Sequence, residues 1–431
     1  MEQIKIADSN EIIYKEKLDN GLEIYFYPNN NVKSFFLSLT TKYGSRQTCF
    51  KRGDEDTYHQ IPNGVAHFLE HISFHLDGME ADDLFVQYGA NINAFTSFDK
   101  TSYIVDCNNS FDKCLDNLLY YVYTPYFTSE TVANEKGIIK EECKRSENDI
   151  NRVFYMNKTK GLFSKSNIIN KVVGELDEIE SITLDDINNA YNTFYHPANM
   201  VLIITGNFDI DEAMKVINTR MNSFKFDKFA GIDVKNPNEP DKVNKEYQEI
   251  ESDLMMNDKV SYSIKIPIKE ALKTGLSLEE YDIYSSMILA ANLDATSDYY
   301  RELLDKDIVR YSSSVTSGIS DEFFIISIIN SPKEGRVEEF IDITNKYVSN
   351  LKYDDKVVKR KIKCELSDYI LSFDDNTSVY SFIISGVIYY GRVLDDYITI
   401  LKSINEKNAN KIIDSIDINN KSILYMKPKS E

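Results

Sequence analysis

The feature that most constrains this chain is a short apolar segment that carries three polar side chains, His67-Phe68-Leu69-Glu70-His71. On an α-helix each residue advances by roughly 100°, so His67 and His71 project from one face with Glu70 beside them. The opposite face carries apolar residues at core-facing spacing: Val65, Phe68, Leu69, Ile72 and Leu76. Asn63 and Gly78 are residue types that cap helices. The pattern predicts a helix between them with one buried face and one polar face.

Two imidazoles one turn apart, with an acid beside them, form the H-x-x-E-H pattern that binds zinc and sets a carboxylate next to its water. The alternative is a chance grouping on a solvated face. Three of the five histidines in the chain, His67, His71 and His75, fall within one short stretch, which favours a metal site. His75 shares the predicted stripe but is expected to be structural or to face a cleft.

A metal held by two histidines needs a third ligand and an open position. Glu135 and Glu142 are seven residues apart in a helix that we expect to begin near Ser129, so they share a face. Glu142 is a candidate third ligand, and Glu135 is a candidate outer hydrogen-bond partner. Taken alone, an acidic helix face more often means a solvated surface.

Length, charge and cysteine content limit the other possibilities. A chain of 431 residues exceeds what one core usually supports, so two or more domains are expected. The net charge of −20 disfavours nucleic acid and anionic membranes as partners. There is no apolar run long enough for a membrane span and no visible signal peptide. Five cysteines without a C-x-x-C pair suit reduced thiols, so we expect a cytoplasmic protein.

The order of predicted elements repeats. In the first half, residues 91–97 and 102–105 predict a β-hairpin, whose edge strand either takes up an extended peptide or is an ordinary sheet edge. A polar stretch with Pro237 and Pro240 reads as a linker. In the second half, helix 278–293 and strands 309–315 and 323–329 follow in the same order, and Tyr284 to Ala291 replaces the motif helix without His or Glu. We expect an α+β fold of two similar domains, antiparallel sheets with helices on one side, related by duplication: 1–228, a linker at 229–245, and 246–431.

Together these segments resemble the pitrilysin/insulinase family of zinc peptidases, the inverzincins. The resemblance rests on the H-x-x-E-H segment, on Gly89 to Thr96, on the pair of downstream glutamates, and on two segments that close the first half, Phe194 to Asn199 and Thr205-Gly206-Asn207. It covers nearly all of the first half. The likeness is strongest to bacterial processing-protease-like members that are encoded as pairs.

The resemblance implies one zinc ion per chain, held by His67, His71 and Glu142. It implies that Glu70 is the general base for the zinc-bound water and that Glu135 is an acid behind the ligands. The family fold has two similar α+β domains, and two chains usually pair to enclose a chamber.

The resemblance also implies substrate contacts. Asn93 and Ala94 match the edge strand that pairs with bound peptide. Active single-chain members and homodimers carry an arginine and a tyrosine, seven residues apart, in the second half. Here the tyrosine is Tyr311, but Leu304 stands at the arginine position.

Two nearby arginines, Arg301 and Arg310, do not have the family's spacing. In paired systems one chain carries the zinc site and the other carries the arginine and tyrosine, so this chain resembles the zinc-bearing member. The expected function is a zinc metalloendopeptidase that cleaves peptides or unfolded segments in a closed chamber. Its expected partner is a related peptidase-like subunit or a second copy. The alternative is a non-catalytic peptide-binding or structural subunit that kept the fold.

Overall fold

The computed structural model describes residues 1–429, and it divides the chain into two compact units. Each unit is assembled from three separate stretches of sequence. Unit 1 comprises Met1–Arg145, Asn170–Asn236 and Ile370–Asp395. Unit 2 comprises Ser146–Ile169, Pro237–Tyr369 and the residues from Asp396 onward. Residues 146–169 thus belong to unit 2, and residues 370–395 belong to unit 1, so each unit includes a helical segment from the other half of the sequence. The domain boundaries expected at 228 and 245 stay a prediction.

Unit 1 is built on a seven-stranded sheet with the order β1-β2-β3-β11-β4-β10-β9. Its strands are β1 (Glu2–Lys5), β2 (Ile12–Lys17), β3 (Glu23–Pro28), β4 (Phe35–Thr41), β9 (Asn91–Thr96), β10 (Thr101–Cys107) and β11 (Met200–Gly206). Neighbours run antiparallel except for β3 and β11, which are parallel. Smaller pieces are β12 (Ile232–Val234) with β5 (Cys49–Arg52) and β6 (His59–Gln60), and the hairpin β7 (His75–Leu76) and β8 (Met79–Glu80).

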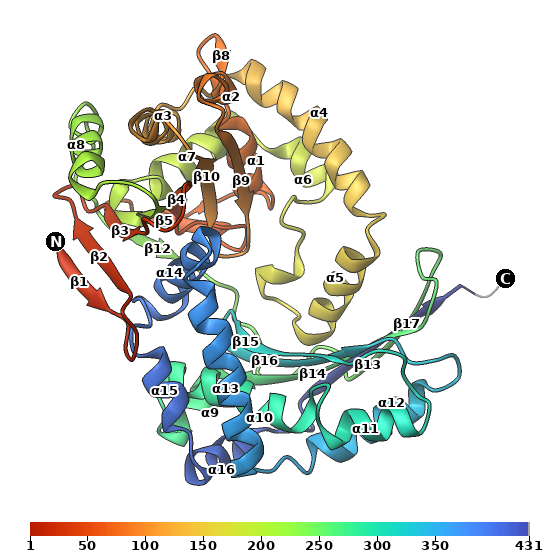
Figure 1. The fold of residues 1–431 in the computed structure, drawn as a ribbon. Helices are drawn as coiled ribbons and strands as arrows, with labels where there is room; N and C mark the ends of the chain where they lie inside the picture. Colours follow the sequence, from red (N-terminus) through yellow and green to blue (C-terminus); the bar gives the residue numbers. More distant parts are fainter. Residues whose placement is uncertain (430–431) are drawn as a thin grey trace. The chain divides into compact units, whose positions relative to one another are not determined.

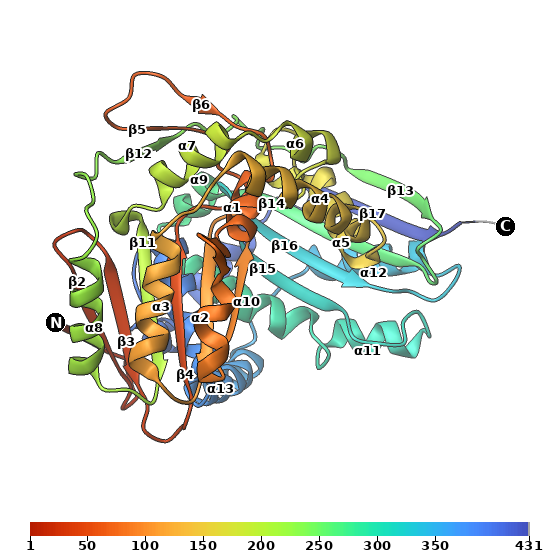
Figure 2. The ribbon, with the colours of Figure 1, turned by 90° about the horizontal axis from the view of Figure 1, so that it is seen from above.

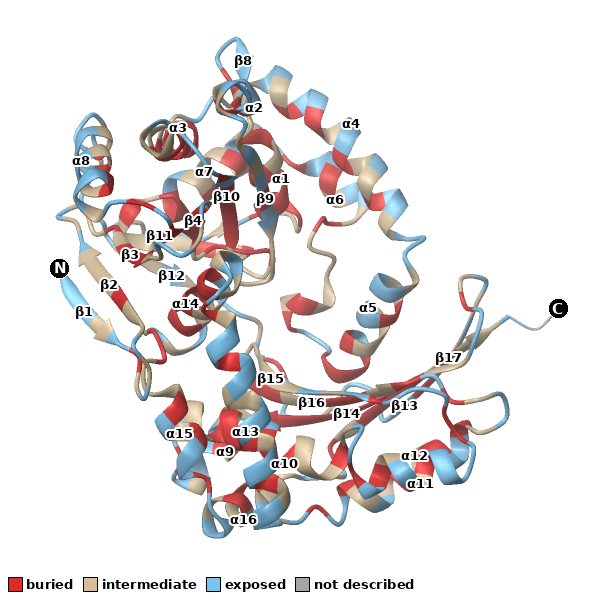
Figure 3. Cartoon of the chain, viewed as in Figure 1, coloured by how far each residue is buried: buried red, intermediate tan, exposed pale blue. Residues whose placement is uncertain are grey.

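The position of each strand in this sheet follows from its composition. The central strands β4 and β11 are buried along their whole length, as expected for strands covered on both faces. The last strand, β9, alternates exposed and covered residues and pairs only with β10, which Figure 3 shows by its mixed colouring beside the largely buried β10. The predicted hairpin is confirmed, and its outer strand is a sheet edge.

Helices cover the sheet of unit 1. They are α1 (Val65–Ile72), α2 (Ala81–Phe85), α3 (Phe111–Tyr123), α4 (Ser129–Ser146), α6 (Leu176–Ser181), α7 (Leu184–Phe194), α8 (Ile210–Met221) and α14 (Asn376–Tyr390). The main core joins the sheet to α1, α3, α7 and α8, and Figure 2 shows α3 and α8 across its strands.

Helix α14 packs on β4 and β11. It meets a row of hydroxyls in which Thr40 Oγ1 lies 3.0 Å from Ser38 Oγ and 2.8 Å from Ser102 Oγ. The Tyr380 hydroxyl of α14 donates to Ser102 at 2.9 Å. Every member of this buried row therefore has a hydrogen-bond partner.

Unit 2 repeats this plan with a five-stranded sheet of order β13-β17-β14-β16-β15. Its strands are β13 (Tyr247–Ser252), β14 (Lys259–Pro267), β15 (Ser314–Ser320), β16 (Phe323–Asn330) and β17 (Lys421–Pro428). Its helices are α5 (Ile150–Leu162), α9 (Ile268–Ala271), α10 (Leu278–Leu293), α11 (Asp298–Asp305), α12 (Val337–Val348), most of α13 (Asp355–Ser372), α15 (Tyr397–Ser403) and α16 (Glu406–Ser415). Helix α5 lies on one face of this sheet, and α10 to α12 lie on the other (Figure 1).

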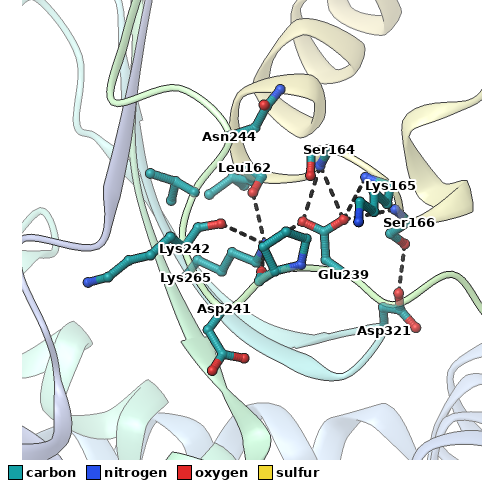
Figure 4. A network of polar contacts seen from close by, with 12 residues as sticks. Leu162, Ser164, Lys165, Ser166, Glu239, Asp241, Lys242, Asn244, Lys265 and Asp321 are labelled. Carbon is teal, nitrogen blue, oxygen red and sulfur yellow. Dashed lines mark hydrogen bonds and ion pairs between the residues drawn. The ribbon is translucent and has the colours of Figure 1, made fainter.

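A buried ion pair attaches the linker to unit 2 (Figure 4). Lys265 Nζ of β14 is fully buried and lies 2.7 Å from Glu239 Oε1, in the predicted linker. It also donates to the carbonyl oxygens of Leu162 at 3.1 Å and Pro240 at 2.8 Å. The Glu239 carboxylate accepts three backbone N–H groups from residues 164–166. Both charges are satisfied inside the protein, which is what a buried pair requires.

The α+β fold with two similar sheets is confirmed, but each sheet contains one parallel pair and has helices on both faces rather than on one side. The strand expected at 309–315 is wrong in position, because β15 begins at Ser314 and Val309 forms only an isolated bridge to Pro332. Among residues 1–429, no helix has the length and apolar content to cross a lipid bilayer.

Candidate metal centre

The motif segment forms α1, and seven of its eight residues are buried. Its start differs from the prediction. Gly64, not Asn63, is the N-cap residue, with a left-handed φ of 91°. A side chain at Gly64 would also meet the Val173 carbonyl oxygen at 2.5 Å, so glycine is required by both conformation and space. Asn63 instead donates through its amide to Glu178.

The end of α1 also differs. The helix stops at Ile72, and Ser73 Oγ donates back to the Leu69 carbonyl oxygen at 2.6 Å. Gly78 lies in the turn between β7 and β8 rather than at the helix end. The prediction that His75 shares the helical stripe is therefore wrong, because His75 lies on the short strand β7.

The two motif histidines and Glu142 come together. Glu142 lies on α4, and its Oε2 atom is 3.6 Å from His67 Nε2 and 3.4 Å from His71 Nε2. The three ligand atoms all lie within 4.8 Å of one another. His67 is 9% exposed, so one side of the group is closed by protein. Two imidazole nitrogens and one carboxylate oxygen are a donor set that zinc accepts, and three ligands leave a position open.

Glu135, two turns before Glu142 on α4, links two histidines. Its Oε1 atom lies 2.8 Å from His71 Nδ1, and its Oε2 atom lies 2.9 Å from His75 Nε2. His75 Nδ1 is in turn 2.9 Å from Glu80 Oε1. A carboxylate on Nδ1 of His71 fixes the ring tautomer that leaves Nε2 for a metal. The involvement of His75 and Glu80 was not predicted, since distance between β7 and α4 has no sequence signal.

Glu70 lies beside the group and is held by β9. The Thr96 hydroxyl donates to Glu70 Oε2 at 2.5 Å, and Glu70 is 9% exposed. Burial raises the pKa of Glu70, although the hydrogen bond from Thr96 opposes this shift. A carboxylate with a raised pKa is better matched to accepting a proton near neutral pH. Thr96 was not singled out from the sequence.

The electrostatics of the group favour a cation. Burial alone would lower the pKa of His71, but hydrogen bonds with Glu135 and Glu142 raise it to about 9. Burial would raise the pKa of Glu135, but the two histidines lower it. Three carboxylates thus surround two imidazoles. The residues fit a zinc ion, because a divalent cation can replace the proton that these carboxylates otherwise hold on His71.

The predicted substrate residues fall in different places. Asn93 is exposed and Ala94 is 8% exposed on the edge strand β9, close in sequence to Thr96. Tyr311 belongs to unit 2, where it precedes β15 and is 75% exposed. Leu304 is an exposed residue of α11, and it offers no hydrogen-bond donor from its side chain.

The sequence matches two family descriptions in succession. Residues 54–176, which include α1 and Glu142, match "Insulinase (Peptidase family M16)". Residues 181–362 match "Peptidase M16 inactive domain". A Bacillus subtilis (strain 168) protein named "Uncharacterized zinc protease YmfH" is 28% identical over 306 residues, which is 71% of each chain. Matches to two further zinc proteases, from Bacillus subtilis and Rickettsia felis, span about half of each relative, 46% and 50%.

Solved structures of similar proteins have the same fold. An M16-like peptidase from Alicyclobacillus acidocaldarius superposes with a TM-score of 0.89 at 24% identity, covering 98% of this chain and 99% of that one. The periplasmic protease PqqL from Escherichia coli superposes with a TM-score of 0.77 at 17% identity, covering all of this chain but only 48% of PqqL. The chain belongs to the insulinase family of peptidases, family M16.

Proposed function

We propose that this protein is a zinc metalloendopeptidase that cleaves peptides or unfolded segments. The observation that carries the proposal is the convergence of His67, His71 and Glu142, with Glu70 beside them. The naming of several relatives as zinc proteases supports the choice of metal.

The proposed mechanism assigns a task to each residue. His67 Nε2, His71 Nε2 and Glu142 would hold zinc, which when bound polarises the scissile carbonyl and lowers the pKa of water toward about 7. Glu70, oriented by Thr96, would accept the proton of the attacking water and pass it to the leaving amine. Glu135 would keep His71 in the binding tautomer.

The edge strand would position the substrate. An extended peptide can add to the free edge of β9 through main-chain hydrogen bonds, near Asn93 and Ala94. Because Thr96 of the same strand holds Glu70, a peptide on this edge would lie close to the base.

We further propose that the working enzyme contains two chains that form a closed chamber. Cleavage needs donors that stabilise the developing negative charge on the peptide carbonyl, and Leu304 cannot supply one. This chain also spans 48% of PqqL and 94% of the first half of PqqL, so a relative carries a second half in the same polypeptide. A related subunit would supply both the arginine and the tyrosine, whereas a homodimer would rely on Tyr311 with Arg301 or Arg310.

The competing candidate is a non-catalytic subunit, and Leu304 together with the "inactive domain" match of residues 181–362 favours it. The test is metal analysis of the purified chain, followed by peptide cleavage alone and with a related chain that carries both residues. We expect one zinc per chain, weak cleavage alone and strong cleavage with the partner. A zinc-replete chain that cleaves nothing with any such partner would favour the non-catalytic role.

We keep the cytoplasm as the proposed location, supported by five cysteines without a disulfide among residues 1–429. PqqL is described as periplasmic, so cell fractionation is the direct measurement.

A further inference from the structure

Unit 2 places a second lysine, which is half-buried, between α5 and its sheet. Lys158 extends from this helix toward the sheet, where its Nζ atom lies 3.4 Å from Ser327 Oγ and 4.9 Å from the centre of the Tyr155 ring. Ser327 belongs to a row of hydroxyls that repeats the row in unit 1, because Ser263 Oγ lies 2.9 Å from Ser261 Oγ and 3.0 Å from Ser327 Oγ. Lys158 thus stands where unit 1 has Tyr380.

The two positions differ in how their polar atoms are satisfied. The Tyr380 hydroxyl is neutral and makes a hydrogen bond of 2.9 Å to Ser102. The Lys158 ammonium has three N–H groups and makes one long hydrogen bond to protein. Among the described residues, no carboxylate lies within ion-pair distance of its Nζ atom. Burial lowers the pKa of Lys158 to about 8.

Lys265 shows how the same unit satisfies a buried ammonium when no ligand is needed. It has the carboxylate of Glu239 and several carbonyl oxygens (Figure 4). The faces of Phe163 and Phe323 also lie 4.5 and 4.2 Å from its Nζ atom. Lys158 has only the Tyr155 ring and a serine hydroxyl. A half-buried cation with no counter-charge beside it loses part of its hydration, so an anion from outside the chain would stabilise it.

A cavity is present for such an anion. It has a volume of about 180 Å³ and lies between α5 and the strands β15 and β16. Lys158, Ser317, Ser320 and Ser327 line it, together with the Tyr155 ring. Ammonium and hydroxyl groups can donate hydrogen bonds to an oxyanion. The volume is below that of sites for whole small molecules, about 300 to 1,000 Å³, but it accommodates a single carboxylate-bearing group.

We propose that Lys158 and these serine hydroxyls bind a carboxylate group of a peptide. The group is either the C-terminal carboxylate or the side chain of an aspartate or glutamate. This inference rests on the proposed function only for the identity of the ligand as a peptide. It adds a preference for acidic or free C-terminal groups to a chain whose own net charge is −20.

The test uses the full chain carrying Glu70→Gln, so that binding is measured without cleavage. Three fluorescent alanine–serine peptides of one length are compared: one with a free C-terminus, one amidated, and one amidated with an internal glutamate. We expect each carboxylate to strengthen binding about tenfold over the neutral peptide, as a charged hydrogen bond does. A gain for only one of the two peptides identifies the source of the carboxylate.

Variants assign the effect to the site. Lys158→Met should remove the gain, and Lys158→Arg should retain most of it. Lys160→Met is the matched control, because Lys160 is an exposed residue two positions further along α5, and it should change nothing. Equal affinity for all three peptides, or a gain that persists in Lys158→Met, would overturn the proposal.

Two further measurements separate the proposed site from misfolding of a variant and from the proposed function. In the protein with dimethylated lysines, the Lys158 methyl resonance should shift on addition of the carboxylate peptides and not of the neutral one; no shift contradicts the site. Zinc-dependent cleavage is then measured with Glu70 intact and with a related chain present that carries the arginine and the tyrosine. Lys158-dependent binding without cleavage would contradict the peptidase, and cleavage without a carboxylate effect would contradict only this site.

Discussion

The two compact units share one strand order but carry different side chains on the helix beside the edge strand. The order β3-β11-β4-β10-β9 in unit 1 corresponds to β13-β17-β14-β16-β15 in unit 2, and each sheet has one parallel pair, β3 with β11 and β13 with β17. Next to β9, α1 carries His67, Glu70 and His71. Next to β15, the segment Tyr284 to Ala291 of α10 carries apolar and small residues and contains no histidine or glutamate.

This difference indicates that the fold alone does not supply the candidate metal site. Unit 2 keeps the sheet, the edge strand and the neighbouring helix, but Tyr284 to Ala291 of that helix has no counterparts of the histidines and the glutamate of α1. The site of unit 1 requires a few residues from α1, α4 and β9, each held by another. Single substitutions in unit 1 that leave its fold intact should therefore remove the difference between the two units.

The largest effect is expected from Glu70→Gln. The substitution conserves size and can still hydrogen-bond Thr96, but it removes the proton acceptor, so turnover should fall by about 10² to 10⁴-fold. Zinc content should not change. Wild-type turnover in this variant, measured with a quenched fluorescent peptide, would remove Glu70 from the role of base.

The next largest effect concerns Glu142. Glu142→Gln should weaken zinc binding more than about 100-fold, the upper range for loss of an outer partner, since it removes a direct ligand. Glu141→Gln is the matched control, because Glu141 is exposed and paired with Lys144 at 2.6 Å. Competition with a chromogenic chelator measures the zinc affinity of both variants. Equal losses in the two variants would contradict the ligand assignment.

A smaller effect is expected from the residues behind His71. Glu135→Gln should weaken zinc binding about 10 to 100-fold, and His75→Ala should do so by about tenfold or less, because His75 acts only through Glu135. His59→Ala serves as a control, since His59 pairs with Glu55 away from this group. A loss in His75→Ala as large as that in Glu142→Gln would instead make His75 a ligand.

The smallest effect sharpens the contrast between Lys158 and Tyr380. The folded-state pKa of Lys158, about 8, lies below its ordinary value of 10.5. The unfolded chain therefore holds this proton more tightly, which reduces stability at neutral pH, and the reduction disappears as pH rises from about 8 to about 10. Lys158→Met should raise the free energy of unfolding by roughly 1 kcal/mol at pH 7, after allowance for partial exposure. Urea unfolding at pH 7 and near pH 10 measures the gain, and equal gains at both would contradict this account.

Much of this molecule could be predicted from local patterns. The helix with His67 and His71, the hairpin of β9 and β10, and the helix from Ser129 all have clear periodicity or turn residues, and each is present. The convergence of Glu142 with the histidines followed from helical spacing and from the family resemblance. Local patterns succeed where one element carries its own apolar face.

The features that were predicted wrongly or not at all have a common physical cause. The position of β15 was wrong because Ser314 to Ser320 is rich in serine and carries little apolar signal, and its register is set by pairing with β16. The contact of His75 with Glu135, and that of Thr96 with Glu70, depend on packing between elements distant in sequence. The placement of α14 in unit 1 is also a tertiary property, since the sequence of this helix is largely apolar and has no distinct polar face.

The exchange of helical segments has a consequence for biosynthesis. A ribosome delivers the strands of unit 1 first, but α14, which covers the hydroxyl row of Ser38, Thr40 and Ser102, is made after most of the chain. Conversely, α5 leaves the ribosome before the sheet it covers in unit 2. Unit 1 cannot complete its structure before α14 has been synthesised, nor unit 2 before β17. Folding of both is thus coupled to synthesis of the C-terminal quarter, and a truncated nascent chain would present uncovered sheet faces to chaperones and proteases.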